Sequence, residues 1–256
     1  MAALVRDVEG EAGQAGAVGV GAPGSVSPLS GKMRNANSTW LNGRAFREDL
    51  EAELGRPVRL ANDANCLALS EAADGAAAGV CCAFAVIIGT GCGGGLAVDG
   101  RLVEGASGIA GEWGHAPLPW PAPDETPGPA CWCGLNGCLE TWISGSGLAR
   151  DHGAGRSERA TAEEIVAAAR SGEATASESL ERYLSRLGRG LAMICNILDP
   201  DVFVFGGGMS KVGELYAQLP ARIAPYVFAD GWRGRLAPAR WGDASGVRGA
   251  ARLWDI

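Results

Sequence analysis

The alternation of short apolar runs with amphipathic stretches predicts a chain that mixes strands and helices. The segments "VRLAND" (58–63), "CCAFAVIIGTG" (81–91) and "DVFVFGGG" (201–208) are apolar and end in polar or glycine-rich residues, as strands do. "AVGVGAPG" (17–24) ends a further strand in a Gly/Pro turn. "GGGLAVDGRLVEG" continues the second of these strands as a hairpin, with Asp-Gly at its turn.

Helices are predicted between these strands. "FREDLEAELG" (46–55) is amphipathic and stops at a glycine, and the other helical patterns cover 64–79, 161–172 and 177–198. A proline-rich segment (117–130) and a polar segment (151–160) are expected to be loops. Strands that alternate with helices indicate an α/β architecture.

Composition narrows the class of protein. The chain has 256 residues, of which 47% are hydrophobic, so it can form one large domain or two small ones. Its formal net charge of −7 argues against binding to nucleic acid or to an anionic membrane surface. No apolar run reaches the length of a membrane span, and the first residues lack the apolar core of a signal peptide. We therefore expect a cytoplasmic protein in which the eight cysteines stay reduced.

Two glycine-rich segments follow predicted strands. The first places Gly89, Thr90, Gly91, Gly93 and Gly94 in a loop at the end of its strand. Backbone N–H groups of such a loop can approach a phosphate, and the Thr90 hydroxyl can donate to it. A tight hairpin turn explains the same residues. Gly206–Gly208 repeat the pattern after another strand, so the two segments fit a nucleotide that lies across a cleft. Neither segment spells the dinucleotide fingerprint G-x-G-x-x-G.

Asn62 and Asp63 stand where a predicted strand ends and a helix begins. A carboxylate at the end of a strand can lie in a cleft and act as a general base. Asp and Asn are also favoured as helix N-caps, and the spacing alone favours the cap.

The segment "CWCGLNGCLE" (131–140) carries three cysteines within eight residues. Together with His115, Cys131, Cys133 and Cys138 make a three-thiolate, one-imidazole set that is common in closed zinc sites. We therefore predict structural zinc here rather than free thiols. Such a site leaves no open metal position for catalysis, and its role would be to hold Glu112 and Glu140 beside the cleft.

Six segments resemble, in the same order along the chain, motifs of the ROK family (repressor, open reading frame, kinase) of sugar kinases. They are "GVGAPGSVSP", "ANDANC", "IIGTGCGGG", "GEWGH", "CWCGLNGCLE" and "DVFVFGGG". The resemblance covers essentially the whole chain. "NANSTWLNG" and "GDASGVRGAARLW" look closest to the bacterial fructokinase (manno-fructokinase) branch, with N-acetylglucosamine kinases as near relatives.

The resemblance implies an actin-like ATPase (ribonuclease H-like) fold with a sugar between two α/β lobes. It implies that Asp63 is the base, that ATP with Mg²⁺ is the phosphoryl donor, and that the protein is a homodimer. Gly89–Gly91 would face the ATP phosphates and Gly206–Gly208 the adenosine. The sugar would be bound, or its binding groups positioned, by Asn62, Glu112, His115 and Glu140.

The family's opening strand and turn, which carry D-x-G-G-T-K, have no counterpart in this sequence, and Met1 falls within the helix before "AVGVGAPG". From usual element lengths we expect on the order of 40 residues to be missing. The small lobe would then be incomplete, and this form would have little kinase activity. Residues 1–74 would be the remnant of that lobe, 75–245 the large lobe with the zinc loop, and 246–256 a helix that returns to the small lobe.

The function expected from this reasoning is ATP-dependent phosphorylation of a hexose, with fructose as the first candidate. Two other functions remain open: a sugar-sensing repressor of the same family, and a sugar-binding protein without turnover. The acidic balance, together with Asp63 and both glycine-rich segments, favours the kinase.

Overall fold

The structure is a computed structural model that describes residues 1–155 and 160–255. The predicted polar loop at 151–160 lies partly outside the described residues. The helices are α1 Ala2–Ala12, α2 Phe46–Leu54, α3 Asp63–Asp74, α4 Leu139–Ile143, α5 Gly145–His152, α6 Ala162–Arg170, α7 Ala174–Leu198, α8 Gly213–Ile223 and α9 Ser245–Ala251. The strands are β1 Val18–Ala22, β2 Ser25–Val26, β3 Met33–Arg34, β4 Val58–Asn62, β5 Cys82–Ile88, β6 Cys92–Val98, β7 Arg101–Val103, β8 Val202–Gly206 and β9 Arg235–Pro238. Within the described ranges, no helix combines the length and the apolar character that crossing a bilayer requires.

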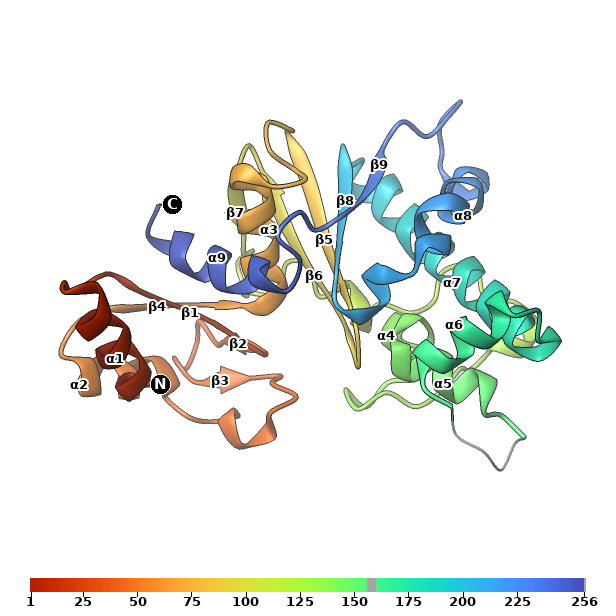
Figure 1. Ribbon diagram of the computed structural model, residues 1–256. Coiled ribbons are helices and arrows are strands. Elements are labelled where there is room, and N and C mark those ends of the chain that lie inside the picture. The colour runs from red at the N-terminus through yellow and green to blue at the C-terminus, as the bar shows by residue number, and fades with distance from the viewer. Residues whose placement is uncertain (156–159, 256) are drawn as a thin grey trace.

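The central element of the described chain is a five-stranded sheet with the order β7-β6-β5-β8-β9 (Figure 1). β5, β8 and β9 run parallel, whereas β6 and β7 are antiparallel additions at one edge. Ile87 of β5 pairs with Gly206 of β8. The glycine-rich segments that follow β5 and β8 therefore lie at the same edge of the sheet.

Helices cover both faces of this sheet, with α3 and α9 on one side and α4–α8 on the other (Figure 1). Phe84, Val86 and Ile88 of β5 join the large core formed with α7, and the alternate residues Ala83 and Ala85 face the opposite layer. The continuous apolar run of this strand follows from burial on both faces.

A smaller unit packs beside the sheet. Its β1 and β4 pair in parallel, and its core contains Val18, Val20, Leu50 and Val58. The C-terminal helix α9 lies directly against β1, since a Cβ at Gly19 would come within 1.8 Å of the Ala250 carbonyl oxygen. The last helix of the described chain thus returns to the first strand, and the division into 1–74, 75–245 and 246–256 stays a proposal.

The predicted elements are present, with changes at their ends. The hairpin of β6 and β7 turns at Asp99 and Gly100, whose φ angles of 50° and 74° are both positive, as a two-residue hairpin turn requires. The helix predicted over 64–79 is wrong at its C-terminus, because α3 ends at Asp74. The carboxylate of Glu71 accepts a hydrogen bond from the backbone N–H of Ala76, which turns the chain out of the helix.

Candidate active site

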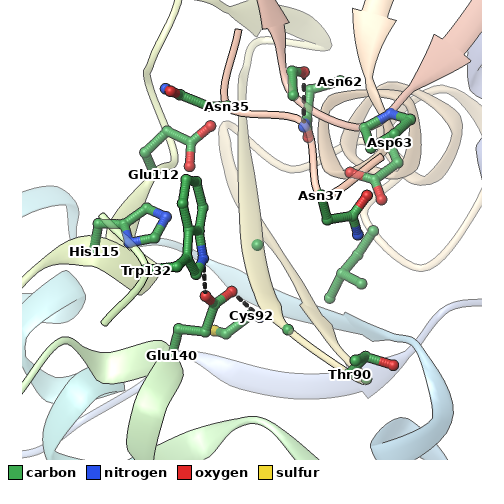
Figure 2. A pocket seen from close by; sticks show the side chains of 16 residues that line it. Asn35, Asn37, Asn62, Asp63, Thr90, Cys92, Glu112, His115, Trp132 and Glu140 are labelled. Carbon is green, nitrogen blue, oxygen red and sulfur yellow. Dashed lines mark hydrogen bonds between the residues drawn. The ribbon is translucent and has the colours of Figure 1, made fainter. Parts of the chain in front are cut away.

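A cavity of about 440 Å³ opens between the small unit and the end of β5 (Figure 2). It brings together segments that lie far apart in the sequence. The residues that line it are Pro23, Gly24, Asn35, Asn37, Asn62, Asp63, Ile87, Gly89, Thr90, Gly91, Cys92, Gly93, Glu112, His115, Trp132 and Glu140. The lining includes all the predicted sugar-binding residues, Asp63 and the first glycine-rich turn.

The sequence allowed two roles at this position, helix N-cap and carboxylate in a cleft, and the structure assigns the cap to Asn62. Asn62 is the N-cap of α3, and its side-chain oxygen accepts a hydrogen bond of 2.8 Å from the backbone N–H of Ala64. Its amide nitrogen donates to the carbonyl oxygen of Gly24 at 3.1 Å. Asp63 is the first residue of the helix and turns its carboxylate toward the cavity (Figure 2). Because Asn62 holds the cap, the capping role does not require Asp63.

The surroundings of Asp63 and Glu112 in the cavity raise the pKa of both carboxyl groups. Loss of solvation by the surrounding protein raises the pKa of Asp63, although a hydrogen bond from Ala64 N–H opposes the shift. Burial also raises the pKa of Glu112; His115 lowers it, and Asp63 and Glu140 raise it further. No side chain of the described residues donates a hydrogen bond to either carboxylate. Both therefore keep acceptor capacity for hydroxyl groups of a ligand.

The turn of Gly89, Thr90 and Gly91 connects β5 to β6 and lines the cavity. A Cβ at Gly91 would come within 2.7 Å of Glu140 Oε2, so a larger residue there would displace this carboxylate from its present position. Gly94 has another reason to be glycine. It lies within β6, where a Cβ would come within 2.7 Å of the Gly111 carbonyl oxygen. The expectation that Gly93 and Gly94 belong to the strand-end loop was wrong, because β6 already begins at Cys92 and both residues pair with β5.

Gly206–Gly208 stand at the end of β8, beside this turn but not among the described lining residues. Gly207 has φ +80°, and a Cβ there would come within 2.4 Å of the Ile88 carbonyl oxygen. The close packing of the end of β8 against β5 is thus a sufficient reason for glycine at position 207, without any contact with a ligand. The contact of these glycines with adenosine stays a prediction.

The four predicted zinc ligands lie together. The Sγ atoms of Cys131, Cys133 and Cys138 and a ring nitrogen of His115 all lie within 4.8 Å of one another. His115 Nδ1 is 3.6 Å from Cys131 Sγ, and the Sγ atoms of Cys133 and Cys138 are also 3.6 Å apart. Ligands at zinc–sulfur distances of about 2.3 Å in a tetrahedron have similar separations. The donor set and its spacing therefore fit a structural zinc ion, with no disulfide among the described cysteines.

Glu140 follows the cysteine cluster at the start of α4 and reaches the cavity. Its Oε2 accepts a hydrogen bond of 2.9 Å from the backbone N–H of Cys92, and its Oε1 accepts one of 2.8 Å from the indole nitrogen of Trp132. Figure 2 shows both bonds converging on this carboxylate. Two fixed donors orient Glu140 and leave lone pairs for a ligand.

Sequence reasoning missed several lining residues. Asn35 and Asn37 reach the cavity from a loop of the small unit, and Asn35 has φ +57°, in the left-handed region that asparagine tolerates. The side chain of Asn42 holds this loop, since it exchanges two hydrogen bonds with the backbone of Ala36. The asparagine-rich segment "NANSTWLNG" was visible in the sequence, but nothing local to it indicates a ligand.

The proline-rich loop that separates His115 from the cysteines is fastened to α7 by a buried carboxylate. Glu125 accepts hydrogen bonds of 2.8 Å from both Arg186 and Arg189. Burial by itself raises the pKa of Glu125, but the hydrogen bonds from the two arginines outweigh it and lower the pKa to about 2. The ion pairs thereby hold the segment that connects His115 to the three cysteines.

Comparisons with known proteins place these features in a family. The N-acetyl-D-glucosamine kinase of Photobacterium profundum is 39% identical over 254 residues, which are 98% of this chain and 84% of the relative. The ROK hexokinase from Thermus thermophilus has a TM-score of 0.85 and 34% identity, over 98% of this chain and 82% of that one. The ROK family glucokinase from Streptomyces griseus, solved in complex with glucose and AMPPNP, has a TM-score of 0.78 and 28% identity, over 98% and 86% of the two chains.

The likeness to these solved structures confirms the predicted mixed α/β fold of the actin-like ATPases. The placement nearest the fructokinase branch is not supported, because curated relatives at 37–39% identity are named N-acetyl-D-glucosamine kinases. The model of the ROK family matches residues 1–256. This chain therefore belongs to the ROK family.

Proposed function

We propose that this protein is an ATP-dependent sugar kinase that phosphorylates the C6 hydroxyl of N-acetylglucosamine. One observation carries the proposal: the Asp63 carboxylate and the Gly89–Gly91 turn face the same cavity as Glu112, His115 and Glu140. A base, a phosphate-binding turn and hydroxyl acceptors are the parts that phosphoryl transfer to a sugar needs. The names of the relatives support the sugar and the donor, since one is an N-acetyl-D-glucosamine kinase and another was solved with glucose and AMPPNP.

Asp63 acts on the attacking hydroxyl. A sugar hydroxyl is a weak nucleophile at neutral pH, and a positioned base contributes about 10²–10⁴-fold to its rate of attack. Asp63 accepts the proton of the C6 hydroxyl as its oxygen approaches the γ-phosphorus of ATP in line. The new bond joins the C6 oxygen to phosphorus, and the bond between phosphorus and the β-γ bridging oxygen breaks to release ADP. The raised pKa of Asp63 makes it a stronger base than an ordinary aspartate.

The other groups bind the substrates. The carboxylates of Glu112 and Glu140 accept hydrogen bonds from sugar hydroxyls, and Asn62 holds the Pro23–Gly24 segment against the start of α3. The Gly89–Gly91 turn lies where backbone N–H groups can meet the ATP phosphates. Mg²⁺, bound with ATP, offsets the negative charge of those phosphates.

His115 and the three cysteines would hold a zinc ion. In this proposal the ion stabilises the loop beside the cavity and takes no part in the reaction. With Nδ1 of His115 turned to the cluster, Nε2 is left for the cavity, so this imidazole can serve both sites. The cluster also holds Trp132, which stands between two of the ligands and bonds to Glu140.

The test is phosphorylation of N-acetylglucosamine, glucose and fructose by the purified protein, followed through ADP release, together with calorimetric binding of each sugar. We expect N-acetylglucosamine to bind most tightly and to have the highest kcat/KM of the three sugars. The absolute rate tests the separate expectation that this form has little kinase activity. Tight binding without any ADP release would support a sugar-binding or sugar-sensing protein instead. Failure to bind any of the three sugars would remove the proposal altogether.

A further inference from the structure

The wall of the cavity that faces Asp63 contains an aromatic side chain with an open surface. Trp132 is 62% exposed although it lines the cavity, and it projects among Glu112, His115 and Glu140 (Figure 2). It is the largest side chain among the described lining residues, in a site otherwise made mostly of glycine, amide and carboxylate groups. Exposed aromatic surface inside a polar cavity is typical of a ligand contact.

The indole is held rigidly. Its nitrogen donates to Glu140 Oε1 at 2.8 Å, and its ring meets the His115 ring edge to face at a centroid distance of 4.9 Å. Its neighbours in sequence, Cys131 and Cys133, belong to the zinc cluster and fix the backbone on both sides. A ring that is already immobilised loses little conformational entropy when a ligand covers it.

The proposed reaction sets the direction of the sugar. If the C6 hydroxyl lies at Asp63, the ring atom C5 that carries C6 is on the same side of the cavity. C2 is the ring atom opposite C5 in a pyranose, so the substituent on C2 points toward the wall of Glu112, His115, Trp132 and Glu140. In N-acetylglucosamine this substituent is an acetamido group, whose methyl is the largest apolar group of the sugar.

We propose that Trp132 forms the subsite for the 2-acetamido group and thereby sets the preference for N-acetylglucosamine over glucose. This inference rests on the proposed kinase function. The ring packs against the acetamido methyl, while the indole N–H holds Glu140 in the orientation that accepts a sugar hydroxyl. The two contributions are separable, because one needs the ring and the other needs the N–H.

The test measures the dissociation constants of N-acetylglucosamine and glucose for the unsubstituted protein, Trp132→Phe and Trp132→Ala. Trp132→Phe keeps a ring and loses the N–H, so both sugars should weaken by a similar factor and their ratio should persist. Trp132→Ala loses both, so binding of N-acetylglucosamine should weaken by a further factor of about ten and the ratio should fall. Zinc content should stay the same in all three proteins.

Leu135→Ala is the matched control, since Leu135 lies in the same cysteine loop, is 63% exposed and is not among the described lining residues. It should change neither affinity. An unchanged ratio of affinities in Trp132→Ala would overturn the acetamido subsite, whether or not both sugars weaken. If the unsubstituted protein binds neither sugar, the proposed function fails first, and the two failures are distinguishable.

Discussion

Glu140 is tied to Cys92, 48 residues earlier, by a hydrogen bond of 2.9 Å from the Cys92 backbone N–H to its Oε2. The carboxylate therefore connects the first residue of β6 to α4, the helix that follows the cysteine cluster. This bond connects the Gly89–Gly91 turn, the proposed phosphate-binding segment, with the wall of the cavity that is proposed to bind the sugar. A change at Glu140 should consequently affect both sides.

We predict that Glu140→Ala weakens binding of N-acetylglucosamine by about tenfold to a hundredfold, because hydrogen bonds to a charged acceptor are lost. Glu140→Gln should lie between Glu140→Ala and the unsubstituted protein, since its amide keeps one oxygen but presents N–H groups to Trp132 or Cys92. Calorimetry measures both affinities. An Ala variant that binds the sugar normally would exclude Glu140 from the site.

Asp63→Asn should lower kcat by about 10²–10⁴-fold and change the sugar affinity little. The amide has nearly the same shape but cannot accept the hydroxyl proton. Because Asn62, and not Asp63, provides the cap, the start of α3 should remain folded in the variant. A folded Asp63→Asn protein with near-normal turnover would contradict the role of Asp63 as base.

The pH dependence of turnover should report the raised pKa of Asp63. The base must be ionised, so kcat should fall as the pH drops through a pKa above that of an ordinary aspartate.

The raised pKa of Asp63 also has a consequence for the stability of the fold. A carboxyl group with a raised pKa in the folded state opposes folding when it is ionised, and this cost disappears below the unfolded pKa. Asp63→Asn should therefore raise the melting temperature at pH 7, and the gain should vanish as the pH falls below the ordinary pKa of an aspartate.

The purified protein should carry about one zinc ion per chain, bound by His115 and the three cysteines. Cys133→Ser should lower both the zinc content and the melting temperature, because metal binding contributes to the folding free energy. Cys81→Ser is the matched control, since Cys81 is also exposed but lies outside the cluster. Equal zinc content in both variants would disprove the predicted ligand set.

Glu125→Gln should destabilise the protein by about 3 kcal/mol or more, since it leaves Arg186 and Arg189 buried without their carboxylate. Glu53→Gln, which breaks an exposed pair with Arg6, should cost less than about 1 kcal/mol. Denaturant unfolding gives both free energies. The lowered pKa of Glu125 adds a pH signature: its stabilisation is present above its ordinary pKa of 4.5 and is lost as the pH falls toward about 2.

The sequence by itself determined the elements and part of the chemistry. Apolar runs predicted β5 and β8, because a strand buried on both faces needs a continuous run of apolar residues. The spacing of Cys131, Cys133 and Cys138 predicted a cluster, because ligands so close in sequence can meet within one loop. The hairpin turn at Asp99 and Gly100 was also predictable, because its conformation depends on these two residues alone.

Only the tertiary structure decided which groups share the cavity. Trp132 is indistinguishable from a core tryptophan in the sequence, and contacts with His115 and Glu140 place its exposed ring in the cavity. The reason for glycine at positions 94 and 207 likewise lies in backbone segments far along the chain, at Gly111 and Ile88. A local pattern records the preferences of its own segment for a helix, strand or turn. It does not record which distant segment packs against it, and these long-range contacts form the site.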